Sequence, residues 1–190
     1  MFFLTRPSPD AIERFLHAAR GLPLSYQPVG LAGQSPSGFS VDDIATVVGS
    51  GEQAFVRAMT ALMDWKHFEL GWVDVFPTRA SIAPGSVVAV LVRHAGVWSL
   101  NACRVVYALD DRSGTEFGFA YGTLSDHGES GEEIFKVTFE PKSGNVSYMI
   151  RAVSRPRAAL ARLGYPLTRV FQARFRRDST RAMARAIATH

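Results

Sequence analysis

The sequence GFAYGTLSDHGESGEEIF, residues 118–135, joins two strand-like segments through a short polar turn. Aromatic and small residues alternate before the turn, and glycine and charged residues fill the turn itself. Strands with so short a connection are antiparallel neighbours, because a parallel crossover needs a dozen or more residues. The stretch therefore predicts a β-hairpin, and the rest of the fold can be built outward from it.

The same period of two extends on both sides of this hairpin, interrupted only by short glycine-containing or polar breaks. It predicts six strands, at residues 71–76, 86–93, 99–109, 116–124, 132–140 and 145–153. Because every break in this run is short, we expect each strand to pair antiparallel with the next.

Helical spacing of apolar residues appears on either side of the strands and predicts helices at 11–20, at 51–70 and in the closing segment. The last helix carries one apolar stripe, formed by Leu167, Val170, Phe171, Phe175, Met183 and Ile187. Its other side is expected to hold Arg169, Arg176, Arg177 and Arg181. Residues 22–50 are rich in Gly, Pro and Ser and predict an irregular segment lying over the body of the domain.

Helices, then a run of strands, then one long amphipathic helix form an α+β pattern. We expect residues 1–190 to be a single domain in which a curved antiparallel sheet of about six strands grips the C-terminal helix. On one face of the first hairpin strand stand Gly118, Ala120 and Gly122. Three small residues in a row allow a close approach to the sheet, by the helix or by a ligand.

The composition indicates a globular protein, with 47% hydrophobic and 20% charged residues and a single cysteine, Cys103. One cysteine excludes an internal disulfide and fits a reducing compartment. The start of the sequence, MFFLTRPSPD, does not resemble a signal peptide, and no window approaches the length of a membrane span. The expected location is the cytoplasm, with no transmembrane segment.

The net charge of +4 hides an asymmetry: residues 151–190 hold ten arginines and one acidic residue, whereas residues 1–150 hold a net negative charge. A basic segment of this kind binds nucleic acid or an anionic membrane in some proteins. The favoured interpretation is an amphipathic helix docked on an acidic body, so no nucleic-acid partner is expected.

The hairpin turn concentrates groups that could carry chemistry, namely His127 with Glu129, Glu132 and Glu133. A metal site is disfavoured because no helix frames these residues with metal-ligand spacing. Glu132 and Glu133 are consecutive in a strand and should face opposite sides of the sheet. The favoured interpretation is a solvated hairpin tip; the alternative is an acid/base role for His127 with Glu132 or Glu133.

Polar residues inside the apolar strands are candidates for ligand contacts. Arg104 should share one face with Ala102, and Asn101, Cys103, Val105 and Tyr107 should share the other. Arg104 lies in the middle of the most apolar strand, which suits a pocket or a buried ion pair. Ligand contacts are predicted for Arg93, Asn101, Arg104, Tyr107, Tyr121 and Tyr148. No nucleotide-binding or nucleophile motif occurs, so no cofactor is implied.

Four stretches resemble the uncharacterised protein family 0548: FLTRPS (3–8), GVWSLNACRVVY (96–107), FGFAYGTLSDHGESGEE (117–133) and SRPRAALARLGYPLTRVFQARF (154–175). The resemblance runs nearly from end to end and brings no activity with it. The order of elements also resembles the helix-grip, or START-like, architecture, in which a curved sheet and a long C-terminal helix enclose an apolar pocket. That second resemblance concerns topology, and a fold does not fix a function.

Three functional hypotheses follow. The leading one is a protein that binds a small hydrophobic or amphiphilic, lipid-like molecule in an apolar pocket. The second is a hydrolase- or cyclase-type enzyme on the same scaffold, with His127 and Glu132 or Glu133 as acid and base. The third is a surface-binding protein that uses the arginine-rich C-terminal helix.

Overall fold

The computed structural model of the protein describes residues 1–94, 96–110, 114–157 and 165–188, with side chains in the last range from residue 168 onward. The helices are α1 (Pro9–Ala19), α2 (Glu52–Met63) and α4 (Tyr165–Ala188), with short 3₁₀ turns η1 (Leu31–Gly33) and η2 (Lys66–Phe68). The strands are β1 (Phe2–Phe3), β2 (Ser40–Ser50), β3 (Val73–Phe76), β4 (Val87–His94), β5 (Val97–Asp110), β6 (Glu116–Thr123), β7 (Glu129–Glu140) and β8 (Asn145–Pro156).

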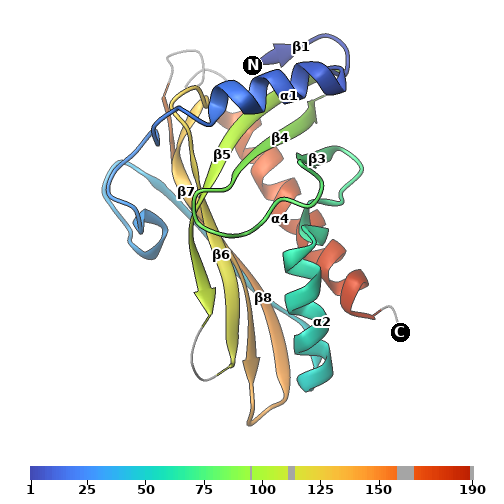
Figure 1. The fold of residues 1–190 in the computed structure, drawn as a ribbon. Coiled ribbons are helices and arrows are strands. Elements are labelled where there is room, and N and C mark those ends of the chain that lie inside the picture. The colour runs from blue at the N-terminus through green and yellow to red at the C-terminus, as the bar shows by residue number, and fades with distance from the viewer. Residues whose placement is uncertain (95, 111–113, 158–164, 189–190) are drawn as a thin grey trace.

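The strands form one antiparallel sheet in the order β2-β8-β7-β6-β5-β4-β3, and β1 pairs with β5. Figure 1 shows this sheet as a curved layer, with α2 and α4 together on one face. We call the face toward α2 and α4 the inner face and the opposite face the outer face. The predicted α+β fold, a curved antiparallel sheet that grips a long C-terminal helix, is confirmed.

All six predicted strands are present, and the hairpin at 118–135 is formed by β6 and β7. The prediction of an irregular segment over 22–50 was wrong for its second half, which forms β2 along the edge of the sheet. The pattern of β2 misleads because Asp42 faces inward while Val41 and Val47 are exposed, the reverse of ordinary alternation. The two-residue strand β1 was also missed.

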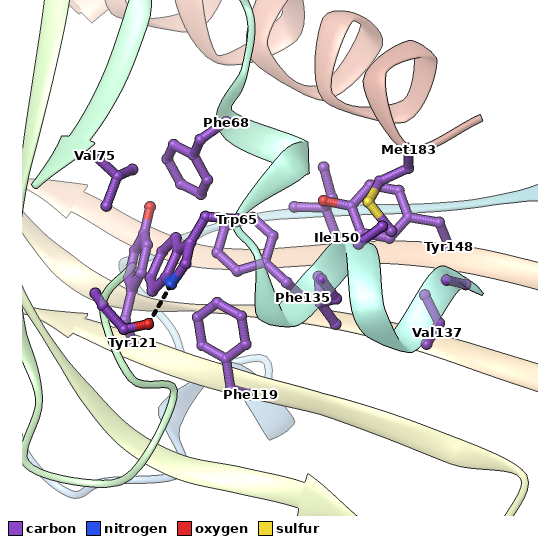
Figure 2. Close-up of a cluster of buried hydrophobic side chains, with 14 of the residues drawn as sticks. Trp65, Phe68, Val75, Phe119, Tyr121, Phe135, Val137, Tyr148, Ile150 and Met183 are labelled. Carbon is purple, nitrogen blue, oxygen red and sulfur yellow. Dashed lines mark hydrogen bonds between the residues drawn. The ribbon is translucent and has the colours of Figure 1, made fainter. Parts of the chain in front are cut away.

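The main core lies between the inner face, α2 and α4. Phe119, Phe135, Val137, Tyr148 and Ile150 extend into this core from the sheet. Figure 2 shows Trp65 and Phe68 near Phe119 and Phe135, and Met183 near Tyr148 and Ile150. These side chains are almost completely buried. Aromatic rings fill most of this interior, so the face toward α2 and α4 is the apolar face of the sheet.

The outer face is covered by α1 and by the segment between α1 and β2. Ile12 of α1 packs on Leu91 and Leu100. Tyr26 of the following segment stands directly over Gly122, where an added Cβ atom would lie 2.2 Å from the tyrosine oxygen. The small-residue face of β6 therefore receives the segment around Tyr26, and the expectation that the helix or a ligand approaches it was wrong.

No helix in the described part of the chain has the length and apolar character needed to cross a membrane.

Candidate functional site

A polar row crosses the inner face of the sheet near one end. The pairing of Asp42 with Ala152, of Ala152 with Glu133 and of Glu133 with Tyr121 places these residues side by side on β2, β8, β7 and β6. Glu129 lies on β7, four residues before Glu133, and so faces the same side. Three carboxylic acids are thus gathered on the face that otherwise carries the apolar core.

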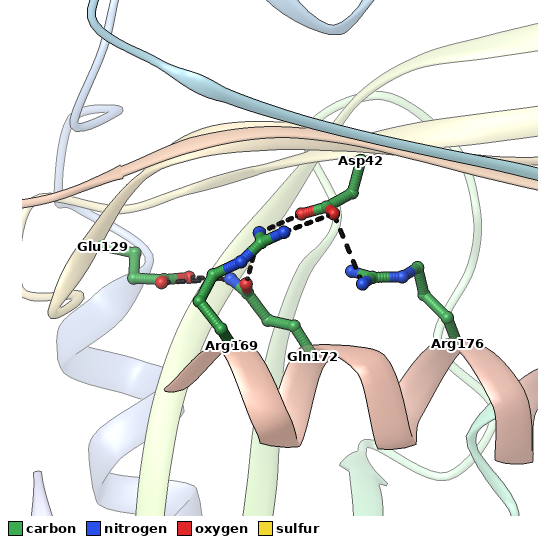
Figure 3. Close-up of polar contacts among 5 residues, drawn as sticks. All are labelled: Asp42, Glu129, Arg169, Gln172 and Arg176. Atoms are coloured by element: carbon green, nitrogen blue, oxygen red, sulfur yellow. Dashed lines mark hydrogen bonds and ion pairs between the residues drawn. The ribbon is translucent and has the colours of Figure 1, made fainter. Parts of the chain in front are cut away.

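The first half of α4 covers this row with polar side chains, as Figure 3 shows. Arg169 pairs with both carboxylate oxygens of Asp42, one of them at 2.7 Å, and Arg176 reaches the same carboxylate at 3.3 Å. Gln172 donates to both oxygens of Glu129, at 3.1 and 3.2 Å. Asp42 is the ion-pair partner of both arginines, and among the described residues neither Glu129 nor Glu133 forms a salt bridge.

Glu133 has a single hydrogen-bond donor among the described side chains, the hydroxyl of Tyr121 at 2.9 Å. Burial raises the pKa of Glu133 to about 7. The hydrogen bond from Tyr121 acts against this upward shift, and the nearby charge of Glu129 adds to it. Burial also raises the pKa of Glu129. Near neutral pH the Glu133 carboxyl is therefore divided between its two protonation states and can either accept or donate a proton.

The Tyr121–Glu133 pair borders the aromatic core. The ring of Tyr121 lies 5.3 Å from that of Phe135 and 6.3 Å from that of Phe68, and the ring of Phe175 of α4 lies tilted against that of Phe68, at 5.0 Å. A molecule held by this pair would have its polar group at Glu133 and its apolar part against these rings.

Two open hollows flank α4. One, of about 340 Å³, is lined by Leu70, Gly71, Trp72, Arg93 and Arg174. The other, of about 400 Å³, lies between β2 and α4 and is lined by Ile44, Thr46, Ala173, Arg176, Arg177, Thr180 and Arg181. Both lie against α4, the helix that covers the polar row.

Glu132 occupies the outer face, opposite to Glu133, as the alternation of the strand predicted. Its carboxylate accepts four hydrogen bonds, from the hydroxyls of Tyr26 (2.5 Å) and Tyr107 (2.8 Å) and the backbone N–H groups of Gly30 (3.0 Å) and Ala32 (3.1 Å). All four lone-pair positions are engaged. Glu132 therefore fastens the segment between α1 and β2 to the sheet.

The predicted ligand contacts are divided between the two faces. Tyr121, Tyr148 and Asn101 face inward; Tyr148 shares a hydrogen bond with Ser179 of α4 (2.9 Å), and Asn101 donates to Ser99 (3.1 Å). Arg93 is exposed beside the first hollow.

Arg104 and Tyr107 face outward together. Arg104 donates to the backbone carbonyls of Arg20 and Leu22, each at 2.9 Å, directly after α1. The expectation that Tyr107 shares a face with Val105 was wrong, because the pairing with β6 slips by one residue between Val105 and Tyr107. Such a bulge turns the following side chains to the other face.

His127 lies in the turn between β6 and β7, where its Nδ1 atom accepts the backbone N–H of Glu129 at 2.9 Å. Burial lowers the pKa of His127 to about 4, so the ring is neutral above that pH. The contact is local to the turn, and no hydrogen bond joins His127 to a carboxylate among the described residues. Within the described ranges, no three His, Cys, Asp or Glu side chains are grouped as metal ligands.

The sequence predicted that the arginines of α4 lie together on the side of the helix away from its apolar stripe. That prediction was wrong. Arg169 and Arg176 turn toward Asp42 on the sheet, while Val170, predicted in the apolar stripe, is exposed. Arg174, Arg177 and Arg181 gather around Asp178.

Sequence reasoning named Tyr121 and Glu133 separately, and it missed Asp42 and Gln172. It placed Glu129 in the hairpin turn, and Arg169 and Arg176 on the side of the last helix away from its apolar stripe. One signal was available, because Glu129 and Glu133 are separated by four residues in a strand and so share a face. Arg169, Gln172 and Arg176 likewise follow the i, i+3, i+7 spacing of one helix face.

Solved structures with the same fold include a hypothetical protein of Helicobacter pylori, at 9% identity and a TM-score of 0.54, covering 86% of this chain and 95% of the other. A norcoclaurine synthase of Thalictrum flavum, solved as a point mutant with a transition-state analogue, has 9% identity and a TM-score of 0.52, covering 81% and 97%. At such identities these likenesses show the helix-grip fold alone.

Closer relatives are found by sequence. A UPF0548 protein of Dictyostelium discoideum is 34% identical over 212 residues, covering 100% of this chain and 97% of that protein. A UPF0548 protein of Deinococcus radiodurans is 32% identical over 200 residues, covering 98% of each. The family model described as "Domain of unknown function (DUF1990)" matches residues 25–182. The chain therefore belongs to the DUF1990, or UPF0548, family, as the four sequence stretches indicated.

Proposed function

We propose that this protein binds a small amphiphilic molecule between the inner face of the sheet and the first half of α4. The observation that carries the proposal is the Tyr121–Glu133 pair, a half-buried carboxyl with one hydrogen-bond donor at the border of an aromatic core. Pockets for small molecules combine an apolar lining with a few convergent polar groups, and residues with displaced pKa values are frequent in them.

The charges around the pair define the chemistry of the ligand. Asp42 already pairs with Arg169 and Arg176, and Glu129 adds a second carboxyl beside Glu133. This environment disfavours an anionic head group and favours a hydroxyl or amine that donates to Glu133. The apolar part of the ligand would lie against the rings of Phe68, Phe135 and Phe175.

Some of the sequence-predicted contacts stay in this proposal. Tyr121 is the central one, and Asn101 and Tyr148 border the same interior. Arg104 and Tyr107 serve the outer face in the structure, where each has protein partners.

The test uses Nile red, a neutral dye whose fluorescence rises in apolar surroundings, displaced at pH 8 by biphenyl or by its para-hydroxyl derivative. The hydroxyl derivative should bind about tenfold more tightly, the equivalent of one modest charge-assisted hydrogen bond. Glu133→Gln should reduce this advantage strongly. Glu140→Gln, the same change at the exposed end of β7, is the matched control and should leave it unchanged. Equal binding of both compounds by the native protein, or no Nile red binding at all, contradicts the proposal.

Acid/base catalysis on a bound molecule is a second candidate, favoured by the pKa of about 7 at Glu133. A hydrolase- or cyclase-type reaction would then use Glu133 with Tyr121, and His127 would stay in the turn. Any compound released from the purified protein can be returned to fresh protein and followed by mass spectrometry. Conversion that Glu133→Gln abolishes supports catalysis, whereas an unchanged compound supports binding alone.

A further inference from the structure

His67 is a completely buried histidine in the aromatic core, and neither of its ring nitrogens has a hydrogen-bond partner. Its ring lies 4.7 Å from that of Phe135, 4.8 Å from Phe68 and 5.6 Å from Trp65, and it approaches Phe119 at 5.8 Å. In the described part of the chain, these two nitrogens are the only buried side-chain nitrogen or oxygen atoms that lack a partner. His67 is therefore an exception among the buried polar side chains that the structure describes.

An unsatisfied polar group is unfavourable in a protein interior, and each one in a native structure calls for an explanation. A Phe or Leu at position 67 would suit the apolar surroundings without that penalty. Burial lowers the pKa of His67 to about 3, so the ring is neutral and offers one N–H donor and one acceptor nitrogen. The site therefore has the capacity for one incoming donor and one incoming acceptor.

The position of His67 relates it to the Tyr121–Glu133 pair. The rings that His67 contacts on the sheet include those of Phe119, two residues before Tyr121 on β6, and Phe135, two residues after Glu133 on β7. Phe119 and Phe135 are paired with each other on the same inner face. Two residues of a strand span roughly 7 Å. His67 therefore lies over the row of the inner face that neighbours the row of Tyr121 and Glu133.

The chain just beyond His67 also borders open space. Leu70, Gly71 and Trp72 line the hollow of about 340 Å³ beside α4, and Glu69 alone separates them in sequence from Phe68. The chain that carries His67 into the core therefore continues directly into the wall of this hollow.

We propose that His67 is a second polar anchor of the ligand site. This inference rests on the proposed function and narrows the ligand class: an apolar, ring-sized frame that carries two hydrogen-bonding groups, one for Glu133 and one for His67. A hydroxyl meets the second requirement, because it can donate to the acceptor nitrogen or accept from the N–H.

The experiment extends the displacement series to para-hydroxybiphenyl with a second hydroxyl on its other ring. The second hydroxyl is placed ortho, meta or para, so that the span between the two oxygens varies, and the isomer that binds the native protein best is used. The second hydroxyl should improve affinity for the native protein about tenfold. In His67→Phe and His67→Leu that second improvement should disappear, while the first hydroxyl keeps its effect through Glu133. Retention of the first effect shows that each variant is folded and that its site is intact.

A second measurement covers the case in which neither variant folds. In native protein labelled with ¹⁵N-histidine, the dihydroxyl compound should shift the ring resonances of His67 and fix one tautomer, whereas biphenyl should not. The inference is overturned if the second hydroxyl does not improve affinity for the native protein, or if that improvement survives in both variants. It is also overturned if the His67 resonances do not respond to the compound, because a bound water alone then satisfies the ring. Loss of every hydroxyl effect would instead refute the proposed function itself.

Discussion

Replacing Glu133 by glutamine should change how the stability of the protein depends on pH. In the folded protein the pKa of Glu133 is raised from its ordinary value of 4.5 to about 7. Between these two values the folded state binds more protons than the unfolded state, so the native protein loses stability as the pH rises. A glutamine at this position does not titrate.

The magnitude follows from the size of the displacement. Each pKa unit corresponds to about 1.4 kcal/mol, so a rise from 4.5 to about 7 amounts to about 3 kcal/mol at most. The difference in the free energy of unfolding between the native protein and Glu133→Gln should therefore fall by this amount between pH 4.5 and pH 7. Outside that window it should change little. The groups that face Glu133 and set the effect are Tyr121, Glu129, Asp42 and Arg176.

Urea unfolding at half-unit steps of pH, for both proteins, gives the difference directly. The buried histidines His67 and His127 have lowered pKa values and destabilise the fold as the pH falls, but they are present in both proteins and largely cancel in the difference. The same measurement on Glu140→Gln, the matching substitution at an exposed position of β7, is the control. A flat curve for Glu133→Gln, or one in which native stability rises with pH, would show that Glu133 is an ordinary solvated carboxylate and would refute the reasoning.

Three further changes test the outer face. Glu132→Gln weakens four hydrogen bonds to a charged acceptor and should lower the free energy of unfolding, measured in urea, by about 2–4 kcal/mol. It should also expose residues 22–39 to limited proteolysis, and unchanged cleavage would contradict the anchoring role of Glu132. Gly122→Ala places a Cβ atom 2.2 Å from the oxygen of Tyr26 and should cost about 1–3 kcal/mol, whereas a neutral result would mean that this tyrosine moves aside freely. Arg104→Met removes donors from two carbonyls after α1 and should lower stability by about 1–3 kcal/mol without altering hydroxyl selectivity; a loss of selectivity would return Arg104 to the ligand site.

The fold was largely predictable because its strands alternate over long stretches and its turns are short. The hairpin at 118–135 and the four other predicted strands are local features, and a period of two reports them directly. Strand β2 was missed because it lies at the sheet edge, where Asp42 points inward to meet arginines that are more than 120 residues away in the sequence. No local pattern can report such a partner.

The site was predictable only in part, for two physical reasons. A one-residue bulge in β5 reversed the faces of Tyr107 and the residues after it, and no local signal in the strand marks that slip. His67 was read as part of a continuing helix, whereas α2 ends at Met63 and Trp65 adopts a left-handed backbone with φ of 57°. This change of direction turns His67 into the core, and its lack of partners is visible only in three dimensions.

Native mass spectrometry of the purified protein, followed by denaturation to release any bound compound, tests the central claim most directly. We predict a discrete excess mass on the folded protein, released on denaturation as an uncharged or amine-bearing molecule with an apolar frame and hydroxyl or amine groups. The same preparation of Glu133→Gln should carry much less of it, and Glu140→Gln should carry as much as the native protein. A ligand-free mass for the native protein, together with no binding of Nile red or of the hydroxylated biphenyls, would contradict the account.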